Sequence, residues 1–299
     1  EIIRKKTFQC LLPGEVNNRV YACDATAELT SLEVPDLVVI GVKNYSLPEV
    51  LDGLEKTFGS DIPVMSVLNG VEHIELISQK FSRSIFCTIA FNAFRTSPSS
   101  AVAVGNSVGL SSITDKEMME AVHKILKRKI SVSIVSNSKD AAHCKLVINL
   151  GNALLTMVGF HENRNRELPV LQHLTAIILN EGIDVVKKAG VKEAHISEMP
   201  NWLLIRLSKI LPKFIVIPIF KKKMQTSSIN SMAQDVRDGA SSTEIEDING
   251  YLVGIADSVG EPAPFNKALY VLFKEWVVSG AQPMRPSALL DRINSFSSR

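Results

Sequence analysis

Asp36-Leu-Val-Val-Ile-Gly-Val-Lys43 is followed, three residues later, by Leu47-Pro48-Glu-Val-Leu-Asp-Gly-Leu-Glu-Lys-Thr-Phe58. The first segment is a continuous apolar run, which is typical of a strand buried inside a parallel sheet. The second segment repeats apolar residues on one helical face and has Pro48 in its first turn, where proline is tolerated. Strand followed by helix is the unit that builds parallel sheets covered by helices. The pattern therefore predicts an α/β fold here.

The same pattern extends to both sides of this unit. Further strands are predicted at residues 63–70, 84–91, 101–110 (one strand or two) and 130–135, with an amphipathic helix at 115–129. Beyond residue 137 the apolar spacing becomes helical almost to the end, at residues 145–158, 170–189, 202–211 and 244–259. Gly190 and Gly260 follow two of these segments as natural C-caps. We therefore expect an α/β domain at 1–137 and an all-α domain at 138–299.

One segment resists assignment. Residues 210–223 are strongly apolar and end in three lysines, but Pro212 and Pro218 interrupt a helical interpretation. The apolar run at 214–220 is far shorter than the roughly 20 residues that span a bilayer. If it is exposed, it could be a surface for a homodimer or another partner, since such patches rarely stay free.

Composition narrows the class of protein. The chain has 299 residues, 33 Lys plus Arg and 31 Asp plus Glu, so its net charge of +2 favours neither nucleic acid nor a membrane as partner. A small-molecule partner is favoured. Four dispersed cysteines without a C-x-x-C pair, and six histidines without metal spacing, predict no disulfide framework and no metal site. A cytoplasmic location fits this cysteine usage.

A dinucleotide-binding protein of this plan would carry G-x-G-x-x-G after its first strand, and that fingerprint is absent. The chain opens with Glu1-Ile-Ile-Arg-Lys-Lys-Thr, without a start methionine or a signal-peptide pattern. We therefore expect it to begin inside its first domain.

Three segments then narrow the function. Ser231-Met-Ala-Gln-Asp235 and Thr243-Glu-Ile-Glu-Asp-Ile-Asn-Gly250 resemble the S-M-x-x-D…T-E-I-D-x-x-N-G signature of the ketopantoate reductase (2-dehydropantoate 2-reductase) family. Lys145-Leu-Val-Ile-Asn149-Leu-Gly-Asn152 is similar to the family's K-L-x-x-N…N segment, and Val42-Lys43 with Leu68-Asn69-Gly70 resemble its V-K and N-G strand ends. The motifs occur in the family's order.

The resemblance implies an N-terminally truncated Rossmann-type parallel-sheet domain followed by a helical domain like that of 6-phosphogluconate dehydrogenase. It implies NADPH-dependent reduction of a 2-keto acid, with ketopantoate and pantothenate biosynthesis as the default. Arg4 would close the second strand and meet the 2′-phosphate of NADPH. The missing part would hold the glycine turn, so we expect weak or no NADPH binding by this chain as given.

The resemblance assigns roles residue by residue. It implies catalysis by Lys145, as general acid, with Glu244. It implies cofactor contacts from Arg4, Lys43, Asn69 and Glu244. It implies substrate contacts from Asn69, Asn149, Asn152, Asn165 and Ser231.

Simpler interpretations stand beside these roles. Lys145, Asn149 and Asn152 share one helical face, which a surface lysine beside asparagines would also show. Glu244 completes Ser241-Ser-Thr-Glu244, a capping box, or Thr243 could start the helix with Glu246 as box partner. Asn69 before Gly70 is also a common turn residue. A non-catalytic remnant acting as a binding or dimerisation module is the rival to the reductase, and the sequence upstream of Glu1 would discriminate between them.

Overall fold

The computed structural model describes residues 7–159, 165–226, 230–240 and 242–297. The chain divides into two compact units, and each is described by itself. Unit 1 comprises residues 1–142 together with 194–199, and unit 2 comprises 143–193 together with 200–299. The division falls within helix α5 rather than at residue 137, and the loop 194–199 packs with unit 1. This loop belongs there because Ser107 Oγ donates to the Ser197 carbonyl and Ile196 joins a core cluster with Val135 and Ala141.

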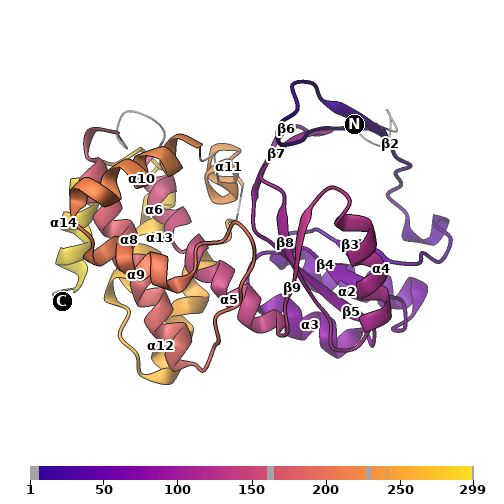
Figure 1. Ribbon diagram of the computed structural model, residues 1–299. Coiled ribbons are helices and arrows are strands. Elements are labelled where there is room, and N and C mark those ends of the chain that lie inside the picture. Colours follow the sequence, from indigo (N-terminus) through magenta and orange to yellow (C-terminus); the bar gives the residue numbers. More distant parts are fainter. Residues whose placement is uncertain (1–6, 160–164, 227–229, 241, 298–299) are drawn as a thin grey trace. The chain divides into compact units, whose positions relative to one another are not determined.

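Unit 1 contains a five-stranded sheet of mostly parallel strands (Figure 1). The strands occur in the order β3 (Val38–Ile40), β4 (Val64–Ser66), β5 (Ser84–Ile89), β8 (Ser107–Ser111) and β9 (Ser131–Ile134). The neighbours are parallel except for the antiparallel pair β5 and β8. The helices of this unit are α2 (Leu47–Phe58), α3 (Glu72–Lys80) and α4 (Lys116–Leu126), with short turns η1 (Leu29–Ser31) and η2 (Asn44–Ser46).

The predicted strands and helices of this sheet are confirmed, with one correction. Helix α2 has the predicted bounds, and its Leu47, Leu51 and Leu54 are buried. Met119 and Val122 of α4 join the sheet residues Ile85, Cys87 and Leu110 in one core cluster. The prediction that residues 36–43 form a buried strand was too broad, because β3 is at the sheet edge and Val39 is 54% exposed.

A second sheet was not predicted. It has four strands in the order β2 (Arg19–Ala22), β1 (Thr7–Leu11), β7 (Ser100–Val104) and β6 (Asn92–Ser97). Strands β1 and β7 pair in parallel although about 90 residues separate them, and both outer pairs are antiparallel. A pairing between segments so far apart leaves no local pattern in the sequence.

Unit 2 is helical, as predicted (Figure 1). Its helices are α5 (Ser138–Asn149, from His143 on), α6 (Gly151–Val158), α8 (Leu168–Lys188), α9 (Trp202–Ile210), α10 (Lys213–Thr226), α11 (Ser231–Arg237), α12 (Tyr251–Val259), α13 (Pro264–Val278) and α14 (Pro286–Ser297). A π-helical turn, η3 (Glu246–Gly250), precedes α12. Gly190 and Gly260 both have positive φ after α8 and α12, as expected of C-cap glycines.

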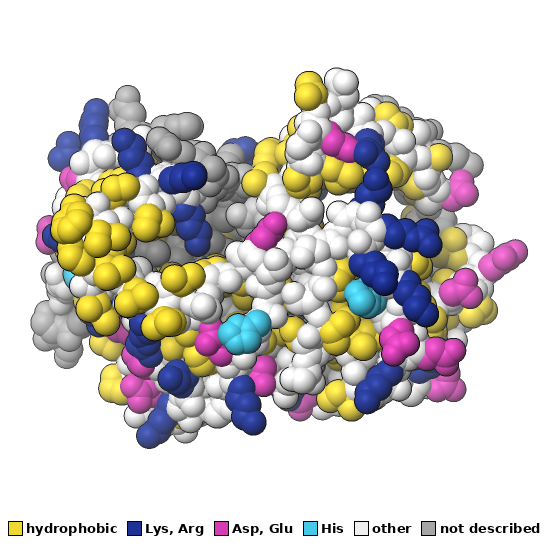
Figure 2. Space-filling model, viewed as in Figure 1, with side chains coloured by type: hydrophobic (Ala, Val, Ile, Leu, Met, Phe, Trp, Pro, Cys, Tyr) yellow, Lys and Arg dark blue, Asp and Glu magenta, His cyan; other side chains and the backbone are white. Residues whose placement is uncertain are grey.

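Helix α8 is the centre of unit 2, because α6, α9, α10, α12, α13 and α14 all contact it. Ser138–Val158, which joins α5 and α6, is long and apolar enough to cross a membrane by length and composition, but 72% of its most apolar window is buried inside the protein. The core helix of a water-soluble domain has the same property. Most of residues 210–223, for which no element was predicted, belong to α10, which has Pro218 inside it. Hydrophobic side chains gather on this side of unit 2 (Figure 2).

Candidate active site

Glu244 and Ser231 lie together in unit 2. The Ser231 hydroxyl donates a hydrogen bond of 2.7 Å to Oε2 of Glu244, although thirteen positions separate the two residues in sequence. The Glu244 side chain is only 8% exposed. A buried carboxylate is costly without hydrogen-bond donors, so the serine hydroxyl stabilises it. The structure thus joins two of the residues that the sequence predicted for the site.

Asn230 fixes the position of Ser231. Its side-chain oxygen accepts from the Ala233 amide and caps α11, and the same oxygen lies 3.2 Å from the Thr156 hydroxyl. Its side-chain amide donates to the carbonyl of Asn152 at 3.3 Å. Asn230 therefore ties the start of α11 to α6, and Ser231 is the first residue of the helix that this cap begins. Sequence reasoning missed this role, although an asparagine before Ser-Met-Ala-Gln is a recognisable N-cap signal.

The three polar residues predicted to share one helical face lie on α5 and α6. Lys145, Asn149 and Asn152 are each partly buried, whereas Leu146, Val147, Leu150, Ala153 and Leu154 around them are buried. The helix is interrupted at Leu150, and the fully buried Asn249 donates from its side-chain amide to the Leu150 carbonyl at 3.2 Å. Asn249 belongs to the Asn249-Gly250 end of the signature motif, but its contact was not predicted. This hydrogen bond fixes the turn between α5, which carries Lys145 and Asn149, and α6, which carries Asn152.

Two capping boxes were predicted around Glu244, one beginning at Ser241 and one pairing Thr243 with Glu246. Ser241 lies outside the described residues. Glu246, the box partner in the second alternative, has its carboxylate bound by the Tyr270 hydroxyl and by Lys274 at 2.7 Å. Burial of the Glu246 carboxyl opposes ionisation, but the hydrogen bonds from Lys274 and Tyr270 outweigh it and hold the pKa of Glu246 below its usual range. Glu246 therefore anchors the π-helical turn to α13.

Two predicted residues of unit 1 lie after neighbouring parallel strands. Lys43 follows β3 and Asn69 follows β4, and both segments leave the carboxyl edge of the sheet, where ligands bind in open α/β folds. Asn44 links them, because its side-chain amide donates to the Asn69 carbonyl at 3.0 Å. The side-chain oxygen of Asn44 is buried and has no donor within the described residues. Asn44 was not predicted as a site residue.

Asn165 and Arg4 are the remaining residues that the sequence predicted for the site. Asn165 is exposed in a short helical turn before α8. Arg4 lies outside the described residues. Cys10, Cys23, Cys87 and Cys144 are free thiols, and the described residues hold no group of three His, Cys, Asp or Glu side chains suited to a metal ion.

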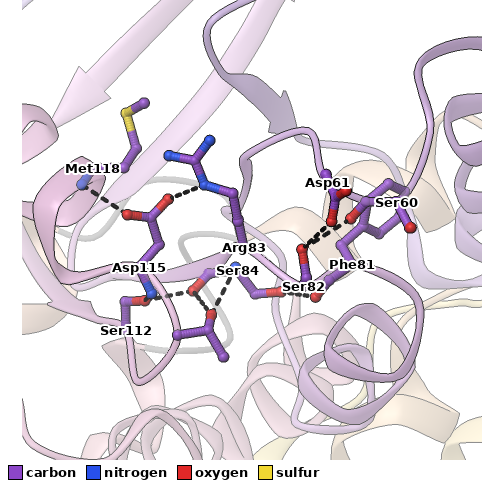
Figure 3. Close-up of polar contacts among 10 residues, drawn as sticks. Ser60, Asp61, Phe81, Ser82, Arg83, Ser84, Ser112, Asp115 and Met118 are labelled. Atoms are coloured by element: carbon purple, nitrogen blue, oxygen red, sulfur yellow. Dashed lines mark hydrogen bonds and ion pairs between the residues drawn. The ribbon is translucent and has the colours of Figure 1, made fainter.

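The charged pair of Arg83 and Asp115 in unit 1 has a structural role (Figure 3). Arg83 Nε donates to one Asp115 oxygen at 2.7 Å, and the other oxygen accepts from the Met118 amide at the start of α4. The Ser112 hydroxyl accepts from the Asp115 amide and donates to the Ser84 carbonyl. The carboxylate of Asp115 thus caps α4 and, through Arg83, links this helix to the start of β5. The pair therefore supports the fold.

Comparison with known proteins agrees with this organisation. Residues 1–111 match the family model described as ketopantoate reductase PanE/ApbA, and residues 137–277 match the model of its C-terminal part. A 2-dehydropantoate 2-reductase of Pyrococcus horikoshii is 25% identical over 247 residues, which cover 80% of this chain and 75% of that protein.

Solved structures show the same fold. The PanE/ApbA family ketopantoate reductase of Ralstonia eutropha JMP134 has a TM-score of 0.73 at 18% identity, covering 94% of this chain and 88% of the other. A D-mandelate dehydrogenase in ternary complex with NADH and anilino(oxo)acetate has a TM-score of 0.72 at 19% identity, covering 93% and 87%.

Proposed function

We propose that this chain, which belongs to the ketopantoate reductase PanE/ApbA family of oxidoreductases, reduces a 2-keto acid with NADPH and that ketopantoate is its substrate. The observation that carries the proposal is the buried hydrogen bond between Ser231 and Glu244. It brings together two parts of the family signature in a polar, water-poor position of unit 2. The free thiols of the four cysteines support a reducing, cytoplasmic location.

The residues of unit 1 fit a nicotinamide dinucleotide. The buried acceptor on Asn44 needs a donor, and it lies beside Lys43 and Asn69 after neighbouring parallel strands. The hydroxyl and amide groups of a nicotinamide nucleotide are donors of the required kind. We propose that Lys43 and Asn69 hold the cofactor, with Arg4 at its 2′-phosphate. The bound cofactor supplies a hydride to the keto carbon.

The residues of unit 2 would complete the reaction. Hydride addition leaves negative charge on the former keto oxygen, and the Lys145 ammonium stabilises that charge and donates a proton to the oxygen. The product is the 2-hydroxy acid. Asn149, Asn152, Asn165 and Ser231 offer amide or hydroxyl donors to the substrate. Glu244 accepts from Ser231, so the hydroxyl is held in a defined direction, and we assign the carboxylate to contacts with the cofactor.

The test is NADPH oxidation with ketopantoate by the full-length protein and by two lysine variants. Lys145→Ala should lose about 10²- to 10⁴-fold in kcat, as expected for a removed general acid. Lys139→Ala is the matched control, because Lys139 lies on the same helix and forms an exposed ion pair with Glu75. Unchanged turnover in Lys145→Ala would remove Lys145 from the mechanism. A comparison with NADH, and with other 2-keto acids, tests the choice of cofactor and substrate.

A further inference from the structure

Helices α9 and α10 leave an apolar face uncovered on unit 2. The face consists of seven large hydrophobic residues that are each more than a third exposed: Leu203, Leu204, Ile210, Leu211, Phe214, Ile215 and Ile219. We call this set the α9–α10 face. Figure 2 shows hydrophobic side chains gathered where Figure 1 draws these two helices. Large contiguous apolar patches on soluble proteins usually mark an interaction site.

The exposure follows from how the two helices pack. Both contact α8, and Trp202 and Ile205 of α9 and Val216 of α10 are buried. Leu203, Ile210 and Phe214 point elsewhere and are 64–78% exposed. Polar residues would be expected on an outer helix face that only meets water. The apolar composition of this outer face is therefore unexplained by the fold of unit 2.

The charges that α9, α10 and their flanking residues carry are all of one sign. Residues 199–234 contain six Lys and Arg and no Asp or Glu. Arg206 pairs with Asp184 of α8, but Lys209, Lys213 and Lys221 are exposed next to the apolar residues, and Lys222 and Lys223 continue the run. The net charge of +2 for the whole chain conceals this local excess. The surrounding charge thus favours an anionic partner.

We propose that the α9–α10 face binds the surface of an anionic lipid bilayer. Apolar side chains flanked by lysines are the composition of helices that lie in the interface of a membrane, with the apolar face among the acyl chains and the lysines at the headgroups. Pro218 fits this position, because it denies the Phe214 carbonyl its helical donor, and water at the interface can supply one. The binding is peripheral and leaves unit 2 folded as it is.

A second copy of the chain fits less well. A two-fold dimer through this face would place the same patch on both sides, so lysines would meet lysines across a low-dielectric contact. An anionic bilayer offers the opposite charge to every one of them. The same apolar residues are buried in either case, so the charges decide between the two occupants.

The experiment is co-sedimentation of the full-length protein with vesicles. Phosphatidylcholine vesicles containing phosphatidylserine should bind the protein, phosphatidylcholine alone should bind it weakly, and added salt should release it. Phe214→Ser with Ile219→Ser should abolish binding. Ile113→Ser with Val278→Ser is the matched control, since these residues lie outside the α9–α10 face and are at least as exposed, and it should bind as the wild type does.

The lysines are tested separately. Lys213→Gln with Lys221→Gln should weaken binding to the anionic vesicles about 30-fold, or about five-fold per lysine, whereas Lys124→Gln with Lys127→Gln on and after α4 should not. Absence of binding to anionic vesicles, or equal loss in the control variants, overturns the proposal. It is also overturned if ultracentrifugation shows a dimer that Phe214→Ser with Ile219→Ser converts to a monomer, because the face is then a contact between copies.

Discussion

The contact between Ser231 and Glu244 predicts a measurable coupling energy. Ser231→Ala removes the hydroxyl that donates to a carboxylate that is only 8% exposed. Hydrogen bonds to charged groups contribute about 1.5–3 kcal/mol, and a buried acceptor left without a donor loses a similar amount. We therefore expect Ser231→Ala to lower the free energy of unfolding by about 2 kcal/mol.

A double-mutant cycle isolates the pair from the other contacts of Glu244. Urea unfolding is measured for the wild type, Ser231→Ala, Glu244→Ala and the double variant, at neutral pH. Glu244→Ala loses every interaction of the carboxylate, so its cost alone does not report on Ser231. The free energy of unfolding lost in the double variant should be smaller than the sum of the losses in the two single variants. The difference, which is the coupling energy, should be about 1.5–3 kcal/mol. Glu244→Gln in place of Glu244→Ala keeps an acceptor without charge and should show a coupling to Ser231→Ala of about 1 kcal/mol.

A coupling energy below about 0.5 kcal/mol would refute the reasoning, because residues without direct contact usually add within that margin. The reductase assay is an independent measurement on the same variants. If the hydroxyl only stabilises the fold, Ser231→Ala lowers stability and leaves KM for ketopantoate unchanged. A raised KM at unchanged fold content supports the proposed substrate contact.

Two further predictions concern stability. Asn230→Ala should destabilise the protein by about 2–3 kcal/mol and Asn201→Ala by about 1 kcal/mol, because both cap a helix but only Asn230 also contacts Asn152 and Thr156; equal costs in urea unfolding would contradict the role given to Asn230. Burial lowers the pKa of His73 to about 4, so the folded state favours the neutral ring. The free energy of unfolding is therefore at its full value above about pH 6.5 and decreases as the pH falls toward 4, because only the unfolded state takes up a proton on this ring. His73→Gln should reduce this acid loss by about 3 kcal/mol, and the exposed His195→Gln should not, as measured by urea unfolding between pH 7 and pH 4.

The elements that the sequence predicts well are those whose signals are local. Helix α2 combines a one-sided apolar pattern, Pro48 in the first turn and Gly59 after the last residue, and its bounds were predicted correctly. The sheet of β2, β1, β7 and β6 depends on pairing between Thr7–Leu11 and Ser100–Val104, and no local pattern encodes a partner so far away. For α10, apolar periodicity alone does not indicate which face is buried. Val216 is in the core while Phe214 and Ile219 are exposed.

In the candidate site too, local motifs were predicted and long-range contacts were not. Motifs predicted Lys145, Ser231 and Glu244 as residues of interest, because a signature fixes residue types at set spacings. They did not predict the contacts of Asn230, Asn44 and Asn249, each of which donates to a backbone carbonyl of another segment. A contact between an asparagine and a distant carbonyl leaves no signal in the sequence, since the carbonyl is present on every residue. These three contacts set the positions of Ser231, of Asn69 and of the turn between α5 and α6. The sequence therefore predicts the residue types of the candidate site, whereas the positions of those residues depend on asparagine contacts that only the fold reveals.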